Sequence, residues 1–322
     1  MKTHYISWWN LENLFDTFNS ENRPDWLAKE LSGELKGWTN EVLEKKLENL
    51  SSVIKQINSN KGPDILGVCE SESEFVIQKL IKKLNIPNRK YEVVHIDSKD
   101  KRGIDIAFIY DELKYTFDGK MFHYEVLKRS ATRDILQAGF ITKNNNRLIL
   151  IGNHWPSRSG GEYKSEPYRM MAGETLSYWL KKIMEIHGDK TPVIVMGDFN
   201  DEPFNRSLVE YALSTNNRKK VIYGRNPYLY NLMWKLFGEK KATYVFNSSL
   251  QIIDQFLVTK GLLLSSSMFS CDESSVRIEA FNGMIKGRYN TPIRFGRPSK
   301  KRSFNLNGFS DHLPISFVVK EK

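Results

Sequence analysis

The stretch Val193-Ile194-Val195-Met196-Gly197-Asp198-Phe199-Asn200 joins four apolar residues to a glycine and two polar side chains. A short apolar run without polar alternation is typical of a strand that is buried on both faces of a sheet. The same arrangement occurs at Ile65–Cys69, which precedes Glu70, and at Arg147–Gly152, which precedes Asn153-His154. The pattern predicts an α/β fold in which buried strands end in reactive side chains.

Helical periodicity separates these strands. In residues 41–57 the apolar side chains recur at spacings of three and four, and Thr39 precedes them as a candidate N-cap. Residues 74–84 form a second predicted helix. Helices therefore alternate with strands along this part of the chain.

Two stretches are rich in aromatic side chains. Residues 168–183 have helical spacing, so we expect Met171 and Trp179 to face the core. Residues 228–237 fit either a core segment or an exposed projection that touches a membrane.

Five further strands are expected, and several of them lie beside the remaining reactive side chains. They are residues 5–9, 91–96, 104–110, 252–258 and 313–319. The chain contains no internal repeat, low-complexity tract or long linker. We therefore expect residues 1–322 to form one domain and the protein to be a monomer.

The composition favours a globular protein with anionic partners. Of the 322 residues, 40% are hydrophobic and 27% are charged, and the formal net charge is +10. Such a positive charge favours nucleic acids or anionic lipid headgroups, although a basic protein without such a partner would look the same.

The two cysteines, Cys69 and Cys271, lie far apart in the sequence, so neither a disulfide framework nor a thiolate metal cluster is expected. No apolar run has the length of a membrane helix, and Met1 to His4 lead directly into a strand. The expected location is cytoplasmic, or secreted if a leader has been removed.

Four acidic residues lie at strand ends, and their carboxylates would repel one another in one pocket unless a cation neutralised them or they kept their protons. They are Glu70, Asp198, Asp254 and Asp311. Oxygen ligands without a thiolate pair favour a hard ion, Mg²⁺ first and Mn²⁺ or Ca²⁺ next. Taken singly, each residue could equally be an ordinary turn or surface residue.

The order and context of these residues resemble the endonuclease/exonuclease/phosphatase superfamily. The blocks that carry the resemblance are Trp9–Asp16, Cys69-Glu70, Arg102-Gly103-Ile104-Asp105, Asn153–Arg158, Gly197–Asp201 and Ser310–Pro314. The resemblance implies a four-layer α/β sandwich, with two packed mixed β-sheets flanked by helices. The strand and helix pattern alone does not separate this fold from a three-layer sheet.

The resemblance also implies roles for individual residues. Glu70 resembles the main metal ligand, with Asn10 and Asp311 in support, and Asn200 resembles a donor to phosphate oxygens. A cation held in this way would polarise the phosphoryl oxygen. An amide donor would stabilise charge that grows in the transition state.

Three other residues resemble groups that handle protons. Asp254 resembles the carboxylate that orients the final histidine, His312, and His312 resembles a general base for water. Asp198 resembles an aspartate that other branches use for the same step, so the identity of the base stays open. His154 resembles the histidine of the deoxyribonuclease and sphingomyelinase branches, which contacts the phosphate or assists the leaving group.

Arginines in or beside these blocks are candidates for phosphate contacts, because a guanidinium suits bidentate binding. We rank Arg158 first, followed by Arg102 and Arg133; the alternative for Arg158 is an ion pair with Glu162 or Glu166. Residues 286–302 are basic without an acidic residue, and fit either a flexible loop that follows a nucleic-acid backbone or a solvated loop without a partner.

These observations predict divalent-metal-dependent hydrolysis of phosphodiester bonds, with nucleic acid as the substrate, as in a nuclease. The alternative within enzymes is a phosphatase or phospholipase that acts on a phosphoinositide, a sphingolipid or a small phosphoester, with a membrane lipid headgroup as partner. The alternative outside enzymes is a non-catalytic nucleic-acid-binding protein.

Overall fold

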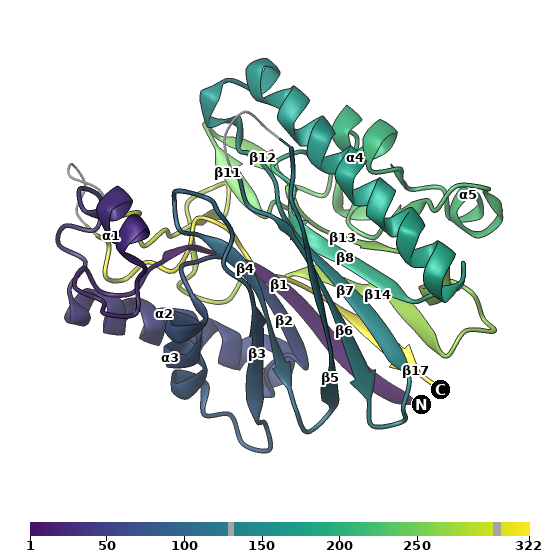
Figure 1. The fold of residues 1–322 in the computed structure, drawn as a ribbon, viewed down its shortest axis with the longest axis horizontal. Helices are drawn as coiled ribbons and strands as arrows, with labels where there is room; N and C mark the ends of the chain where they lie inside the picture. Colours follow the sequence, from purple (N-terminus) through teal and green to yellow (C-terminus); the bar gives the residue numbers. More distant parts are fainter. Residues whose placement is uncertain (128–131, 299–303) are drawn as a thin grey trace.

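Two large mixed sheets pack face to face in the computed structural model, which describes residues 1–127, 132–298 and 304–322 (Figure 1). The first sheet has the order β14 (Phe269–Ile278), β17 (Ile315–Glu321), β1 (Lys2–Leu14), β2 (Ile65–Ser71), β4 (Asp105–Asp111) and β3 (Tyr91–His95). The second has the order β5 (Tyr115–Tyr124), β6 (Ile135–Thr142), β7 (Arg147–His154), β8 (Val193–Asp198), β13 (Asp254–Val258), β10 (Leu229–Asn231) and β9 (Ser214–Thr215).

Only β1–β2, β7–β8 and β9–β10 pair in parallel within these two sheets, as far as the structure describes them. Two small hairpins lie outside them: β11 (Tyr244–Phe246) with β12 (Ser249–Gln251), and β15 (Ile285–Lys286) with β16 (Thr291–Pro292).

The main core fills the space between the two sheets. Phe317 from β17 packs on Phe256 from β13 at 4.7 Å between ring centroids, and Phe108 from β4 contacts Phe140 from β6 edge-on. Trp8 of β1 is fully buried in the same cluster. Burial of this apolar surface joins the sheets and fixes how their strand ends meet.

Helices cover the two outer faces. On the outside of the first sheet lie α1 (Asp25–Leu31), α2 (Asn40–Asn60) and α3 (Glu74–Leu84), whose apolar faces share one cluster with β1, β2 and β4. On the outside of the second sheet lies α4 (Glu162–His187), with the short α5 (Arg218–Tyr223) near the sheet's edge. This confirms the four-layer α/β sandwich with two mixed sheets flanked by helices.

Local signals in the sequence account for the helix limits. Thr39 caps α2, because its Oγ1 accepts a hydrogen bond from the backbone N–H of Val42 at 3.4 Å. Although α2 extends to Asn60, the backbone angles of Ile57, Asn58 and Ser59 are no longer those of a right-handed helix. The regular helix therefore ends where the apolar periodicity ends.

The expected core stripe of α4 was partly wrong. Its buried side chains include Ala172, Leu176 and Leu180, whereas Met171 is 44% exposed and Trp179 is 37% exposed. The sheet covers only a narrow strip of this helix, so residues on the flanks of the apolar stripe remain in solvent. Trp179 instead stacks on Tyr124 of β5, at 4.5 Å between ring centroids.

The aromatic stretch 228–237 belongs mainly to the core. Met233 and Leu236 are buried, whereas Phe237 is half exposed and packs edge-on against Phe204. No helix among the described residues combines the length and the apolar character that a membrane crossing requires.

Candidate active site

The site is built around the carboxyl end of β8. In the register of the second sheet Asp198 lies opposite His154 of β7 on one side and opposite Asp254 of β13 on the other. Glycine at position 197 lets β8 lie close to β7, since a Cβ there would lie 2.4 Å from the backbone oxygen of Asn153. Three predicted site residues thus meet at one edge of one sheet.

The first sheet supplies the opposite wall. Asn10 of β1 donates a hydrogen bond through Nδ2 to Oδ2 of Asp198 at 3.1 Å, which links the two sheets directly. Asn10 is also held in place, because its Oδ1 accepts the backbone N–H of Glu12 at 2.9 Å. The carboxylate of Glu70, at the end of β2, accepts the backbone N–H of Asn13 at 3.0 Å.

A second pair joins the sheets through His312. Its Nδ1 lies 2.7 Å from Oδ2 of Asp254, and its Nε2 lies 3.8 Å from Oδ2 of Asp198. The other oxygen of Asp254 accepts a hydrogen bond from the indole N–H of Trp8 at 3.2 Å. The predicted pairing of Asp254 with the final histidine is therefore present.

His154 faces the same carboxylates. Its Nε2 lies 3.5 Å from Oε1 of Glu70 and 3.8 Å from Oδ2 of Asp198. Its Nδ1 is buried and has no hydrogen-bond partner among the described residues. Asp311 lies beside His312, with 4.0 Å between Oδ1 of Asp311 and Nε2 of His312.

Burial and mutual repulsion control the charges of this cluster. Burial raises the pKa of Asp198 to about 7 despite the opposing attraction of His312, and burial together with Glu12 raises the pKa of Asp311 to about 7. Burial alone would lower the pKa of His312. The negative charges of Asp254 and Asp198 have the larger effect and hold its pKa well above the usual range. For His154, burial and the nearby Arg102 hold the pKa well below the usual range.

The donor set fits a hard divalent cation. Ligand atoms of Asp198, Asp254 and His312 lie within 4.8 Å of one another, and Glu70 reaches the same space through its 3.5 Å contact with His154. Carboxylate and amide oxygens dominate this set, and they are the ligands that Mg²⁺ and Mn²⁺ prefer. A cation here would relieve the repulsion that raises the carboxyl pKa values.

Asn200 lies two residues after the end of β8, beside Asp198. Its backbone N–H donates to Oδ1 of Asp198 at 3.0 Å, and its Nδ2 donates to the backbone oxygen of Trp155 at 2.9 Å. A side-chain amide carries two N–H groups, so one donor is still available for a ligand. The residue has a left-handed φ of 52°, which asparagine tolerates better than most residues.

Comparison with known families agrees with this geometry. A family model described as the endonuclease/exonuclease/phosphatase family matches residues 5–321. The chain belongs to this family. A search of curated proteins finds no match.

Solved structures of several other proteins share the fold. A humanized D. rerio TDP2 covers 99% of this chain and 99% of its own, with 14% identity and a TM-score of 0.60. The human nocturnin catalytic domain, with bound sulfate, covers 99% and 95%, with 16% identity and a TM-score of 0.55. A Bacteroides thetaiotaomicron mannosyl-6-phosphatase covers 98% and 99%, with 15% identity and a TM-score of 0.56. At these identities the likeness concerns the fold alone.

The guanidinium of Arg158, our first candidate for phosphate binding in this family member, is occupied within the protein. Its Nε donates to the backbone oxygen of Asn200 at 2.7 Å, and its terminal nitrogens pair with Asp201 at 3.0 Å and Glu162 at 3.1 Å. The alternative ion pair with Glu162 is therefore present. In this arrangement Arg158 supports the loop that carries Asn200.

Arg102 and Arg133 lie around Asp100. Arg102 donates to Asp100 at 2.7 Å, and about a third of its side chain remains exposed. Arg133 is buried, lies 3.5 Å from Asp100, and donates to the backbone oxygen of Trp155 at 2.7 Å. The Nε of Arg133 has no partner among the described residues. Its bond to Trp155 ties Arg133 to the residue that follows His154.

The basic segment is more ordered than expected over its described part. Residues 285–292 form the β15–β16 hairpin, and Phe295 is fully buried. Arg297 pairs with Glu34 at 2.7 Å. Lys300, Lys301 and Arg302 lie outside the described residues.

Three residues of the site were not assigned a role from the sequence. Arg294 donates to the buried Glu12 at 2.8 Å and lies 3.3 Å from Asp311. It therefore links Asp311, a candidate metal ligand, to Glu12. Lys46 of α2 is fully buried, and its ammonium donates to the backbone oxygen of Phe309 at 2.6 Å. Glu12 could have been found, because it lies in the Trp9–Asp16 block. Lys46 could not, because the helical pattern of residues 41–57 does not indicate a contact with the backbone of Phe309.

Proposed function

We propose that this family member hydrolyses phosphodiester bonds in nucleic acid and requires a divalent metal ion. One observation carries the proposal: side chains from five separate segments gather around Asp198. They are Asn10, Glu70, His154, Asp254, Asp311 and His312. Of the four acids, Asp198 and Asp254 are buried and Glu70 and Asp311 are partly buried. Bringing them together without a ligand would cost stability, so a purely structural role explains the cluster poorly.

Glu70, Asn10 and Asp311 would hold the metal, as the resemblance implies, and Mg²⁺ is the first choice by ligand type. When bound, the ion would polarise the phosphoryl oxygen and offset the charge that develops there. Asn200 and the arginines near His154 would add N–H donors toward the same phosphate.

The remaining side chains divide the proton transfers. Asp254 fixes the ring of His312 through Nδ1, so that Nε2 is directed toward Asp198. Either Asp198, or Nε2 of His312 once the ring has lost its own proton, would take the proton from the attacking water. His154 would stay neutral because of its burial, and would donate a hydrogen bond from its ring N–H to the phosphate or to the leaving oxygen.

Two features support nucleic acid as the substrate. The net charge of +10 favours a polyanion. Arg102 lies near enough to His154 to lower its pKa, and Arg133 donates to the backbone oxygen of the next residue, Trp155. The rival substrate is a small phosphoester. It is suggested by the fold shared with a protein named as a mannosyl-6-phosphatase. We further propose that residues 1–322 act as one domain and as a monomer.

A turnover panel tests the proposal. Purified protein with Mg²⁺ is offered single-stranded and duplex DNA, RNA, mannose 6-phosphate, inositol phosphates and sphingomyelin, with and without a chelator. Asp198→Ala and His312→Ala should each lower turnover of nucleic acid by at least ~10²-fold. Equal rates in wild type and both variants would refute a catalytic role, and turnover of sphingomyelin or sugar phosphate alone would refute the substrate.

A further inference from the structure

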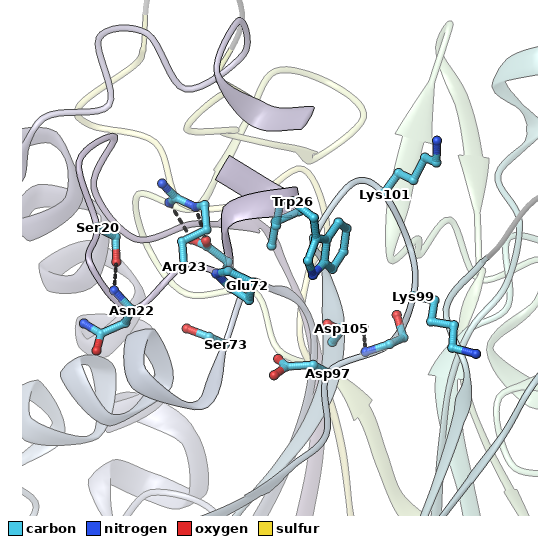
Figure 2. A pocket seen from close by; sticks show the side chains of 14 residues that line it. Ser20, Asn22, Arg23, Trp26, Glu72, Ser73, Asp97, Lys99, Lys101 and Asp105 are labelled. Carbon is cyan, nitrogen blue, oxygen red and sulfur yellow. Dashed lines mark hydrogen bonds and ion pairs between the residues drawn. The ribbon is translucent and has the colours of Figure 1, made fainter. Parts of the chain in front are cut away.

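A pocket of about 470 Å³ opens between α1 and the segment that joins β3 to β4 (Figure 2). This volume lies in the range of small-molecule sites. Its wall near α1 includes Arg23, Trp26 and Leu27, and its floor includes Glu72 and Ser73, just after β2. None of these residues had been assigned to the site described above.

The pocket and the candidate active site share one segment of chain. In residues 97–105 the side chains of Asp97, Lys99 and Lys101 line the pocket. Asp100 and Arg102, which are not among its lining residues, pair with each other at 2.7 Å, and Asp100 also contacts Arg133 near His154. The segment therefore has one side toward the pocket and another toward the catalytic residues.

Hydrogen bonds hold this segment in one conformation. The backbone N–H of Ser98 donates to Asp105 at 3.1 Å, and Asp100 accepts the backbone N–H of Arg102 at 3.0 Å. Gly103 has a left-handed φ of 57°, and a Cβ there would lie 2.7 Å from Leu27. Glycine thus allows α1, which carries Trp26, to pack directly on the segment.

The lining side chains have complementary chemistry. Trp26 is 47% exposed, and in Figure 2 its indole lies between Arg23 on one side and the segment that carries Lys99 and Lys101 on the other, with Asp97 below it. Lys101 has only a long contact with Glu30, 3.5 Å at a largely exposed pair, and Lys99 has no ion pair with any residue that the structure describes. Both ammonium groups are therefore available for an anion.

We propose that this pocket is a subsite for a nucleotide adjacent to the scissile phosphate, with its base stacked on Trp26 and its outer phosphate near Lys99 and Lys101. Every base has a π-face that stacks on an aromatic side chain without strict sequence preference. The exposed carboxylate of Asp97 accepts hydrogen bonds from the amino groups that adenine, guanine and cytosine carry. The proposal rests on the proposed function, since it names the part of the substrate that lies beside the cleaved bond.

The pocket is tested separately from catalysis by a binding measurement in a chelator, where no turnover occurs. The probe is a dinucleotide that carries fluorescent 2-aminopurine on the 5′ or the 3′ side of its phosphate, and stacking on an indole quenches its emission. Wild type should quench one of the two probes. Trp26→Ala should abolish the quenching and weaken binding by about tenfold, because base–aromatic stacking contributes about 1–3 kcal/mol.

Variants control for indirect effects. Trp26→Phe should retain part of the binding, and Tyr223→Ala, which removes an exposed aromatic of α5 far from α1 in Figure 1, should behave as wild type. Lys99→Ala and Lys101→Ala should weaken binding while leaving the quenching of the bound probe intact. These two exposed positions keep the test decisive if the Trp26 variants fold poorly.

Turnover with Mg²⁺ then separates the two proposals. Trp26→Ala should lower kcat/KM for the dinucleotide by about tenfold and leave bis(4-nitrophenyl) phosphate hydrolysis unchanged. Equal quenching by wild type and Trp26→Ala, or equal losses on both substrates, would overturn the subsite. Quenching that depends on Trp26 in a protein without turnover would refute the proposed function and uphold the subsite as a nucleotide-binding pocket.

Discussion

Nδ1 of His312 lies 2.7 Å from Oδ2 of Asp254, and both side chains are almost entirely shielded from solvent. Trp8 holds the other oxygen of Asp254 at 3.2 Å, so the carboxylate is fixed on both sides. Its charge stabilises a protonated ring and leaves Nε2 directed toward Asp198. The pair therefore sets both the orientation of the histidine and its proton affinity.

Asp254→Asn should lower kcat by roughly 10²-fold with little change in KM, because the amide preserves the shape but removes the charge that supports His312. Steady-state kinetics on the best substrate of the panel measures both constants. Asp272→Asn is the matched control, since that carboxylate pairs with Lys320 at 2.8 Å on β14 and β17. An Asp254→Asn enzyme as fast as this control would contradict the role assigned to the pair.

Glu70→Gln should weaken activation by Mg²⁺ by at least about tenfold, because an amide is a poorer ligand for a hard cation than a carboxylate. Activity is measured against Mg²⁺ concentration, and calorimetric titration with Mg²⁺ gives a second readout without substrate. Glu273→Gln, on a partly exposed residue that pairs with Arg218, serves as control. Superimposable Mg²⁺ curves for wild type and Glu70→Gln would contradict the assignment.

Asp105 should make the protein less stable as the pH rises from about 4 to above 7. Burial raises its pKa in the folded state to about 7, whereas the unfolded value is near 3.9. Between these values the folded state binds a proton that the unfolded state lacks, so stability falls with pH by up to about 1.4 kcal/mol per unit. Urea unfolding at pH 5 and pH 8 should show a smaller decrease for Asp105→Asn than for wild type; parallel decreases would count against this pKa.

Lys46→Met should lower the free energy of unfolding by about 1–3 kcal/mol, because the backbone oxygen of Phe309 loses its donor. Asn49, one turn further along α2, donates to the backbone oxygens of Leu306 and Gly308 at 2.8 Å each, so Asn49→Ala should act in the same direction. Both positions hold the loop that leads into Asp311. Lys45→Met, at an exposed neighbour, should stay within about 0.5 kcal/mol of wild type in urea unfolding.

Local patterns predicted most of the central strands and the long helices, but not the buried strand β6. The helix over residues 74–84 coincides with α3, and the buried run from Val193 begins β8 where expected. Strands at the sheet edges, such as β5 and β14, were missed because they are half exposed and interrupted by bulges, which weakens their apolar pattern. The prediction of a single domain stays a prediction.

The site was predicted where a reactive residue follows a buried strand. His154 and Asp198 follow apolar runs, whereas Asp254 begins β13, and strand register brings the three residues together. The commitment of Arg158 to Asn200, Asp201 and Glu162 depends on how loops pack, which local sequence does not specify. The same holds for Arg294, whose partner Glu12 is 282 positions away.

The first sheet contains strands from both ends of the chain, while the second is made from the stretch between them. The hydroxyl of Ser310 donates to the backbone oxygen of Asn10 across 300 positions, and β1 pairs with β17. During synthesis, β1 can pair with β2 early, but its other neighbour, β17, is made only when nearly the whole of this sequence has left the ribosome. Until then Asp311 and His312 are missing from the site, so a chain that ends before them would lack the partner of Asp254.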